Sequence, residues 1–388
     1  MQEDKDMVIT KDIIYAGVDD HQIDLFEGQF TVPLGMAYNS YVILDEKTAV
    51  MDTVDGKFTQ VWLNNLKEVL GDKIPDYLVI HHMEPDHSAS IQAFTEVYPE
   101  TVLVGNAQTF KFMDQFYPGL QNTRRQVVTN NGTLELGSHT LTFVFAPMIH
   151  WPEVMMSYDS QDKVLFSADA FGKFGANDVE DPEGWDCEAR RYYFGIVGKY
   201  GPQVQAVLKK AQALDIQIIC SLHGPVLTEN IAYNVDKYNT WSSYEPEDEG
   251  VFIAYASIYG HTKEAAEKLA GILEEKGIEY KIADLAREDI YECVENGFRY
   301  SKLVLASVTY NTEVFPVMKQ YIELLKERNY QKRTVAFIEN GTWAPMAAKT
   351  MQNLLSTCKE LTFVEPVVTI RSSLNDDTPI RELAEKLG

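Results

Sequence analysis

Hydrophobic residues in the first part of the chain fall into short runs rich in β-branched side chains, a pattern typical of strands. These runs predict strands at residues 40–44, 49–51, 77–81, 102–104, 140–145, 164–166 and 216–220. Helical spacing appears between some of them, at residues 58–70 and 204–214. Many short strands with inserted helices indicate an α/β or α+β sandwich of about 245 residues, which one domain can accommodate.

After residue 250, predicted strands and helices alternate regularly along the chain. Strands are predicted at residues 251–257, 280–283, 303–307, 334–338 and 364–370, with helical patterns between or after them. Five strands alternating with helices predict a small doubly wound parallel sheet. The polar, acidic stretch at residues 242–250 contains Pro246. It separates the region of many short strands from the region in which strands and helices alternate regularly. It predicts one domain at residues 1–247 and a second at residues 250–388.

Charge and cysteine usage narrow the function classes. The chain has 388 residues and a formal net charge of −24, which disfavours nucleic acid and anionic membrane surfaces as partners. Its four cysteines stand far apart, which excludes a rubredoxin-type iron site or a zinc ribbon and favours a reducing compartment. The acidic N-terminus and the absence of a long apolar run predict a cytoplasmic protein with no membrane segment.

Metal-capable side chains gather where predicted strands end. The run His-His-Met-Glu-Pro-Asp-His follows the strand at residues 77–81, and three further candidates each follow a strand of their own. A single histidine at such a place is usually a hydrogen-bonded core or loop residue, which is the interpretation given to His21, His139 and His261. His81 is predicted to point away from its neighbour. The concentration of the others predicts a metal site, formed by His82, Glu84, Asp86, His87, His150, Asp169 and His223.

The pattern His-x-Glu-x-Asp-His, followed by a distant His, Asp and His, resembles the metallo-β-lactamase-like fold, an αββα sandwich, in its flavodiiron variant. Zinc hydrolases of that fold usually carry histidine where this chain has Glu84, and a carboxylate suits iron better than zinc. The resemblance implies two non-haem irons with Asp169 bridging them. It assigns His82, Glu84 and His150 to one iron and Asp86, His87 and His223 to the other, although His87 does not contact the metal in some family members.

Three loops of the second domain offer groups that suit a flavin phosphate and ring. The first lies between a strand and a helix, where backbone N–H groups and the helix dipole favour a phosphate. The other two follow the third and fourth strands and present aromatic faces; taken singly, each is equally an ordinary surface loop. Together they resemble the flavodoxin pattern, which binds FMN. The residues are Ser257, Ile258, Tyr259, Gly260, His261, Thr262, Thr309, Tyr310, Asn311, Asn340, Gly341, Thr342 and Trp343.

Both resemblances, in this order, match the two-domain form of the flavodiiron proteins, also called A-type flavoproteins. The family implies reduction of dioxygen to water, of nitric oxide to nitrous oxide, or of both. Electrons would pass through FMN from a carrier such as rubredoxin, or from a reduced deazaflavin. The family also implies a head-to-tail homodimer or a dimer of dimers. Tyr193 resembles a family tyrosine near the irons that could donate a hydrogen bond, but it is equally consistent with an ordinary core aromatic.

Two other functions stay open at this point. One is a zinc hydrolase with an appended flavodoxin domain, against which Glu84 counts. The other is an FMN electron carrier with a vestigial metal site, against which the complete ligand set counts. The substrate also stays open, because dioxygen and nitric oxide need the same iron pair with free coordination positions.

Overall fold

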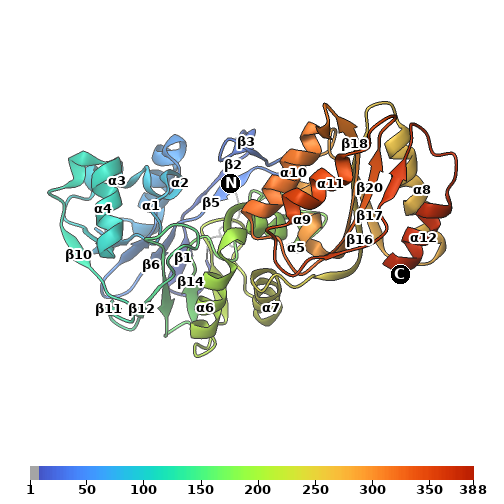
Figure 1. The fold of residues 1–388 in the computed structure, drawn as a ribbon. Coiled ribbons are helices and arrows are strands. Elements are labelled where there is room, and N and C mark those ends of the chain that lie inside the picture. The colour runs from blue at the N-terminus through green and yellow to red at the C-terminus, as the bar shows by residue number, and fades with distance from the viewer. Residues whose placement is uncertain (1–7) are drawn as a thin grey trace. The chain divides into compact units, whose positions relative to one another are not determined.

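The computed structural model describes residues 8–388, which form two compact units (Figure 1). One unit contains the chain up to Tyr193 together with Pro202–Tyr238, and the other contains Phe194–Gly201 together with Asn239–Gly388. The acidic residues 1–7 lie outside the described part. No helix among the described residues is long and apolar enough to cross a membrane.

The N-terminal unit is a sandwich of two sheets. The first sheet has the strand order β1-β6-β7-β8-β9-β10, and from β7 to β10 its neighbours run parallel. The second has the order β11-β12-β13-β14-β15. The bounds are β1 Ile13–Tyr15, β6 Tyr41–Ile43, β7 Ala49–Met51, β8 Tyr77–Val79, β9 Val102–Gly105, β10 Arg125–Val127, β11 Thr133–Glu135, β12 Thr140–Phe145, β13 Met155–Asp159, β14 Val164–Phe166 and β15 Ile218–Cys220.

Apolar side chains of the two sheets meet in one core. Met51 and Val79 of the first sheet belong to the same buried cluster as Leu141 and Phe143 of the second. A two-stranded antiparallel sheet, one hairpin and several helices complete the unit. These are β2 Val18–Asp20 with β5 Met36–Tyr38, β3 Leu25–Phe26 with β4 Phe30–Thr31, α1 Thr59–Leu70, α2 Pro85–Ser88, α3 Ile91–Val97, α4 Ala107–Phe116, α5 Asp186–Tyr192, α6 Gly201–Ala211 and α7 Ile231–Ser242. Short 3-10 or π turns lie at η1 Gly56–Phe58, η2 Pro118–Leu120, η3 Tyr193–Val197 and η4 Gly198–Tyr200.

The C-terminal unit is a doubly wound parallel sheet with the strand order β17-β16-β18-β20-β21. In chain order this is 2-1-3-4-5, the flavodoxin arrangement. Its strands are β16 Asp248–Ala256, β17 Tyr280–Asp284, β18 Tyr300–Tyr310, β19 Glu313–Val314, β20 Thr334–Asn340, β21 Thr362–Phe363 and β22 Val368–Ile370. Its helices are α8 His261–Glu275, α9 Ile290–Arg299, α10 Pro316–Glu327, α11 Ala347–Leu355 and α12 Thr378–Leu387.

The predicted fold class is confirmed, and the differences are local. The fifth strand, predicted as 364–370, is split into β21 and β22, which both pair with β20. Pro366 lies between them and has no N–H to donate to a ladder. The third strand is longer than predicted, because β18 runs on to Tyr310 and turns back into β19. Asn311 and Thr312 form this turn with positive φ angles of 50° and 65°, which match the twist of a tight hairpin.

One segment separates from its sequence neighbours. Residues 194–201 pack with the C-terminal unit, where the ring of Phe194 stacks on Phe298 at 4.1 Å and its carbonyl accepts a hydrogen bond from Nε of Arg328. The sequence predicts one domain boundary near residues 247–250. That boundary does not account for residues 194–201, which belong to the C-terminal unit. The domain boundary at that position stays a prediction.

Candidate metal centre and flavin loops

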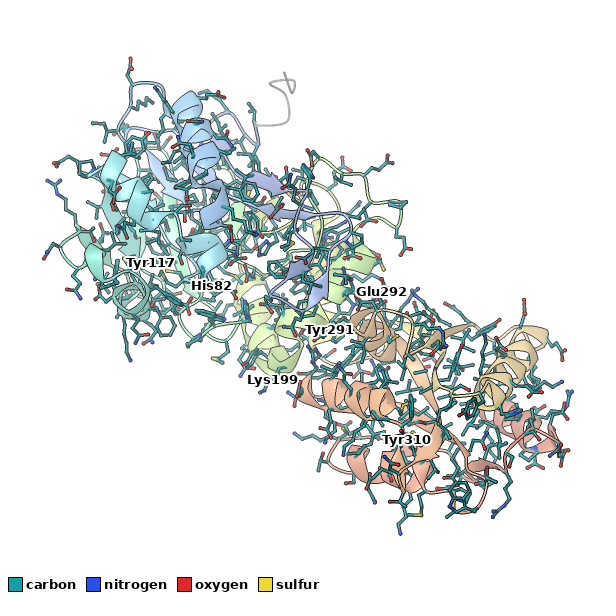
Figure 2. All side chains as sticks on the ribbon, turned by 90° about the horizontal axis from the view of Figure 1, so that it is seen from above. His82, Tyr117, Lys199, Tyr291, Glu292 and Tyr310 are labelled. Carbon is teal, nitrogen blue, oxygen red and sulfur yellow. The ribbon has the colours of Figure 1, made fainter. Side chains whose placement is uncertain are left out.

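The seven predicted metal-facing residues come from four loops that end strands of both sheets in the sandwich. Four follow β8, where Pro85 opens α2 at a helix position that needs no N–H and Glu84 precedes it as the N-cap. The others lie between β12 and β13, after β14 and after β15. Gly224, next to His223, has φ +74°, and a Cβ there would lie 2.6 Å from the Lys173 side chain. Figure 2 labels His82 within this unit.

Four of these side chains converge as a first group. Oε2 of Glu84 lies 3.2 Å from Nε2 of His82 and 2.9 Å from Nε2 of His150. Oδ2 of Asp169 lies 3.1 Å from Nε2 of His150 and 3.5 Å from Nε2 of His82. One atom from each residue therefore lies within 4.8 Å of the others, which is close enough to surround one cation.

Three more side chains form a second group beside the first. Nε2 of His87 lies 3.0 Å from Nε2 of His223, and Oδ2 of Asp86 lies 3.3 Å from both nitrogens. Asp169 also reaches this group, because its Oδ1 lies 3.3 Å from Nε2 of His87 and 3.9 Å from that of His223. Asp169 thus turns one oxygen to each group.

Hydrogen bonds on the far side of two imidazoles fix which nitrogen faces the centre. Nδ1 of His82 lies 2.7 Å from Oε1 of Glu153, which also accepts the N–H of Met83. Nδ1 of His223 donates to the carbonyl of Ala37 at 2.7 Å. With Nδ1 carrying the proton, the lone pair of Nε2 points into the site. Glu153 gives no signal in the sequence, because a carboxylate that orients a histidine has no motif of its own.

The centre is strongly anionic. Burial disfavours a charged imidazole, but the nearby carboxylates, that of Asp169 foremost, outweigh it and raise the pKa of His82 well above its ordinary value. The carboxylates likewise outweigh burial at His150 and raise its pKa to about 9. Burial alone would raise the pKa of Asp169. The surrounding imidazoles outweigh this effect and hold that pKa well below the usual range. Such a site favours cations, either protons or metal ions.

The polar atoms of the centre fit a pair of metal ions. Both carboxylate oxygens of Asp86, Oδ1 of Asp169 and Nδ1 of His87 are buried atoms without a hydrogen-bond partner among the described residues. Leaving buried polar atoms unpaired costs about 1–3 kcal/mol each, which coordination would offset. Imidazole and carboxylate donors together suit iron. The residues present therefore fit the implied diiron pair.

The two adjacent tyrosines of α5 and η3 have different surroundings. The ring of Tyr192 lies 5.6 Å from that of His223 and is fully buried, and its hydroxyl has no hydrogen-bond partner among the described residues. Burial raises the pKa of Tyr192, and the charges of Asp169 and Asp86 add to the effect. The Tyr193 ring instead lies 5.1 Å from Tyr238. The structure therefore brings the Tyr192 ring beside His223, whereas the role predicted for Tyr193 stays a prediction.

The histidines interpreted as structural do have other partners. Nδ1 of His81 lies 2.5 Å from Oδ2 of Asp52, and its Nε2 lies 2.7 Å from Oγ of Ser157. This resembles a nucleophile–base–acid arrangement, but all three residues are at most 1% exposed, so a substrate has no access. His139 contacts Asp159 in a similar way at 3.1 Å.

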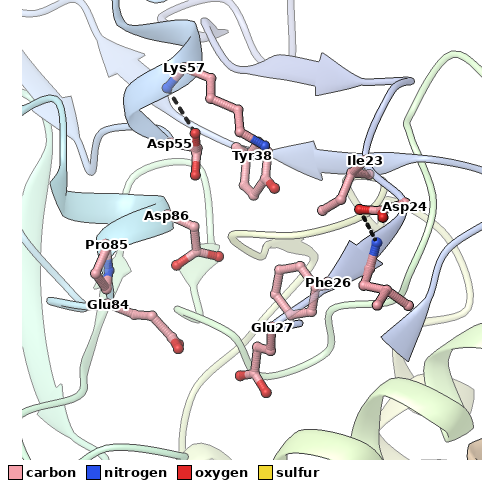
Figure 3. A pocket seen from close by; sticks show the side chains of 11 residues that line it. Ile23, Asp24, Phe26, Glu27, Tyr38, Asp55, Lys57, Glu84, Pro85 and Asp86 are labelled. Carbon is pink, nitrogen blue, oxygen red and sulfur yellow. Dashed lines mark hydrogen bonds between the residues drawn. The ribbon is translucent and has the colours of Figure 1, made fainter. Parts of the chain in front are cut away.

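A cavity of about 280 Å³ opens beside the metal centre. Glu84 and Asp86 line one side of it, and the β3–β4 hairpin lines another (Figure 3). Phe26 of this hairpin sets its ring edge against His223 with 5.3 Å between ring centres. The cavity thus connects the metal-facing carboxylates with solvent and has room for a small molecule.

The three predicted flavin loops follow β16, β18 and β20, which are neighbours in the sheet and run parallel. Their loops therefore share one edge of the sheet, where doubly wound folds bind ligands. In the first loop Gly260 has φ +96°, which favours glycine, and its N–H donates to Oγ of Ser257. No side chain caps the N-terminus of α8, so its N–H groups are available to a phosphate.

Three aromatic side chains at this edge are open to solvent. Tyr259 is 91% exposed, Trp343 is 87% exposed and Tyr310, labelled in Figure 2, is 44% exposed. Large exposed aromatic rings on three adjacent loops offer faces to a planar ligand. The polar groups have structural partners as well, since Oγ1 of Thr309 accepts the N–H groups of Met346 and Ala347. Asn340 donates to the carbonyl of Ser372.

Known proteins resemble the chain over both units. Residues 36–224 match the ODP family beta lactamase model, and residues 253–380 match the flavodoxin model. A nitric oxide reductase of Moorella thermoacetica is 28% identical over 94% of this chain and 93% of its own. A putative diflavin flavoprotein of Synechocystis is 31% identical over 69% of this chain, which spans about half (47%) of that longer protein.

Solved structures show the same fold over the whole length. The structure of a rubredoxin oxygen:oxidoreductase from Desulfovibrio gigas has a TM-score of 0.89 at 24% identity, covering 98% of this chain and 96% of its own. A flavodiiron protein from Giardia intestinalis has a TM-score of 0.90 at 23% identity, covering 100% of this chain.

Proposed function

Because the chain belongs to the flavodiiron protein family, whose members are oxidoreductases, we propose that it reduces dioxygen to water, nitric oxide to nitrous oxide, or both, at a diiron centre. The observation that carries this proposal is the position of Asp169 between two groups of imidazoles and carboxylates, one oxygen toward each. A shared carboxylate reduces the repulsion between two cations a few ångströms apart.

The proposed ligands of one iron are His82, Glu84 and His150, and those of the other are Asp86, His87 and His223. Asp169 serves both. When bound, the iron pair supplies the electrons and the coordination positions for the diatomic substrate. The Nε2 contacts of His87 to Asp86 and Asp169 support its role as a direct ligand in this chain.

The remaining residues of the centre position and protect these ligands. Glu153 and the carbonyl of Ala37 hold His82 and His223 with Nε2 toward the site. Tyr192 keeps its phenolic proton, because burial and nearby carboxylates raise its pKa, and it can therefore donate a hydrogen bond into the site. Phe26 and Tyr192 also cover His223 with apolar surface and limit the access of water.

FMN is the proposed cofactor of the C-terminal unit, in agreement with its flavodoxin match. Residues 257–262 and the N-terminus of α8 would hold the phosphate. Tyr259, Tyr310 and Trp343 would contact the ring, with Thr309, Asn311, Asn340, Gly341 and Thr342 as polar and backbone anchors. The flavin would accept single electrons or pairs from a carrier and pass them to the irons.

A rubredoxin-type protein is the proposed electron donor, with a reduced deazaflavin as the second candidate. The name of the Desulfovibrio gigas relative supports the first. The resemblance to the family also supports a head-to-tail homodimer or a dimer of such dimers, in which the flavin of one subunit serves the irons of another.

Metal analysis and anaerobic gas uptake test the proposal together. We expect about two irons and one FMN per chain, and consumption of dioxygen or nitric oxide when rubredoxin and its reductase supply electrons. Assays with each gas separately decide the substrate. Stoichiometric zinc with esterase or lactamase turnover would instead support the hydrolase, and flavin cycling without gas uptake in iron-loaded protein would support the electron carrier.

A further inference from the structure

The β3–β4 hairpin places one carboxyl group at the mouth of the cavity beside the metal centre. Phe26 anchors the hairpin through its ring contact with His223, and Phe30 anchors it from the other strand through Phe174. Glu27 follows Phe26 at the turn, with φ +49°, and lines the cavity together with Glu84 and Asp86 (Figure 3). Its side chain is also open to solvent.

We propose that Glu27 carries protons from solvent into this cavity and donates them to the substrate during reduction. This inference rests on the proposed function. Reduction of one dioxygen consumes four electrons and four protons and forms two waters. Reduction of two nitric oxide molecules consumes two electrons and two protons and forms one nitrous oxide and one water. Either reaction therefore needs a group that repeatedly brings protons to the site.

The metal-facing residues do not meet this need. Histidine and carboxylate atoms bind a metal ion only in their deprotonated forms, so the seven proposed ligands hold no proton to give at those atoms. Tyr38 lines the same cavity, but burial raises the pKa of its phenol far above the physiological range. A group that releases a proton only at very high pH can donate a hydrogen bond but is slow to complete a transfer.

The basic side chain of Lys57 also lines the cavity, and the two remaining carboxylates there are engaged in their own turns. Oδ1 of Asp24 accepts the N–H of Leu25 at 2.9 Å, and Oδ1 of Asp55 accepts the N–H of Lys57 at 2.8 Å. Glu27 instead contacts the flexible side-chain amide of Gln29 at 3.2 Å. Its carboxyl group is therefore able to turn between solvent and the cavity.

Electrostatics agree with this geometry. Desolvation by the surrounding protein raises the pKa of Glu27 to about 7, Glu84 and Asp86 act in the same direction, and His150 acts against them. A proton donor works best when its pKa is near the working pH. Bound cations lower this pKa, because their positive charge favours the ionised carboxylate. The carboxyl group therefore has to be followed both without metal and with it.

Three variants test the proposal in the full chain. Glu27→Gln removes the transferable proton but keeps the size of the side chain, and Glu27→Asp keeps the carboxyl group. Glu68→Gln is the control, since Glu68 is an exposed glutamate of α1 outside the lining of the cavity. The measurements are the carboxyl titration by ¹³C NMR in metal-free and zinc-loaded protein, the iron and FMN contents, and gas uptake from pH 5 to 9.

We expect Glu27→Gln to lower gas uptake at pH 7 by about 100-fold, as is typical when a proton donor is lost, and to flatten its pH profile. Iron and FMN contents should not change, Glu27→Asp should recover part of the rate, and Glu68→Gln should match the wild type. The NMR signal lost in Glu27→Gln should titrate between pH 5 and 8 in the zinc-loaded protein.

Either of two results would overturn the inference alone: wild-type rate and pH profile in Glu27→Gln, or a Glu27 carboxyl that stays ionised from pH 5 upward when zinc is bound. If iron-loaded wild type with full flavin reduces neither gas, the proposed function itself fails and the inference fails with it.

Discussion

Glu153 holds His82 by a hydrogen bond between its Oε1 and Nδ1 of the imidazole, at 2.7 Å, with both side chains completely buried. The Glu153 carboxylate fixes the proton on Nδ1 and so directs the lone pair of Nε2 into the metal centre. Its own Oε2 has no hydrogen-bond partner among the described residues, so the contacts of Oε1 with His82 and with the N–H of Met83 hold this side chain.

We expect Glu153→Gln to lower metal affinity about 10- to 100-fold, the usual effect of losing a carboxylate behind a ligating histidine. The glutamine oxygen keeps a neutral hydrogen bond but removes the charge that makes His82 a stronger ligand. Chelator-buffered zinc titrations of the metal-free protein measure the change. Glu68→Gln, on the exposed face of α1, is the control. Equal zinc affinity in both variants would show that Glu153 has only a packing role.

Asp169→Asn tests the bridging position. Asparagine keeps the shape and one oxygen donor but removes the negative charge between the two groups, so two cations repel each other more strongly. We expect loss of at least one of two irons and a sharp fall in gas uptake, while reduction of FMN by the donor continues at its normal rate. Iron analysis and steady-state rates check this. Full iron occupancy with near-normal turnover would contradict the bridging role.

The metal-facing residues were accessible to sequence reasoning because each follows a short buried strand. His82, Asp169 and His223 come after β8, β14 and β15, and the ends of such strands were read from apolar runs. Glu153 gave no such signal, since its role depends on a contact across 71 residues. The packing of residues 194–201 with the C-terminal unit also depends on tertiary contacts, which local pattern does not encode. The strand break, by contrast, follows from Pro366 itself, which has no N–H to donate.

The adjacent tyrosines Tyr192 and Tyr193 are two candidates for the hydrogen-bond donor near the metal centre. Tyr192 and Tyr193 are identical in type and adjacent, but successive helical residues point about 100° apart, and the two rings meet different neighbours, His223 and Tyr238. We expect Tyr192→Phe to lower gas uptake about tenfold through the loss of one hydrogen bond in the reaction, with unchanged iron content. Tyr193→Phe, which removes the neighbouring hydroxyl but keeps the ring contact with Tyr238, is the matched comparison. A larger effect of Tyr193→Phe on turnover at full iron content would reverse the assignment.

Exposed aromatic rings of the flavin loops should contribute to FMN affinity. We expect Trp343→Ala to raise the Kd for FMN about three- to tenfold, the usual value of one aromatic stacking contact. Trp343→Phe keeps a ring face and should recover most of the affinity. Fluorescence titration of flavin-free protein measures both. Iron content should stay the same, since the metal-facing residues belong to the other unit. An unchanged Kd in Trp343→Ala would remove this ring from the proposed site.

Metal binding should release protons, because the anionic centre holds them when no metal is present. The pKa of His150 is raised from 6.5 to about 9, so His150 is protonated at pH 7 in the metal-free protein and must lose this proton to bind a metal. Zinc affinity should therefore rise at least about tenfold per pH unit from pH 7 to 9, because the raised pKa of His82 adds a second competing proton. The raised pKa of His150 stabilises the metal-free fold fully below pH 6.5, and this contribution is lost as pH rises through about 9. Raising the pH should thus strengthen zinc binding while lowering the metal-free unfolding temperature.

His150→Gln should weaken both trends, whereas His21→Gln, which removes a surface contact with Asp178, should keep them. Identical pH slopes in wild type and His150→Gln would show that His150 does not hold the competing proton.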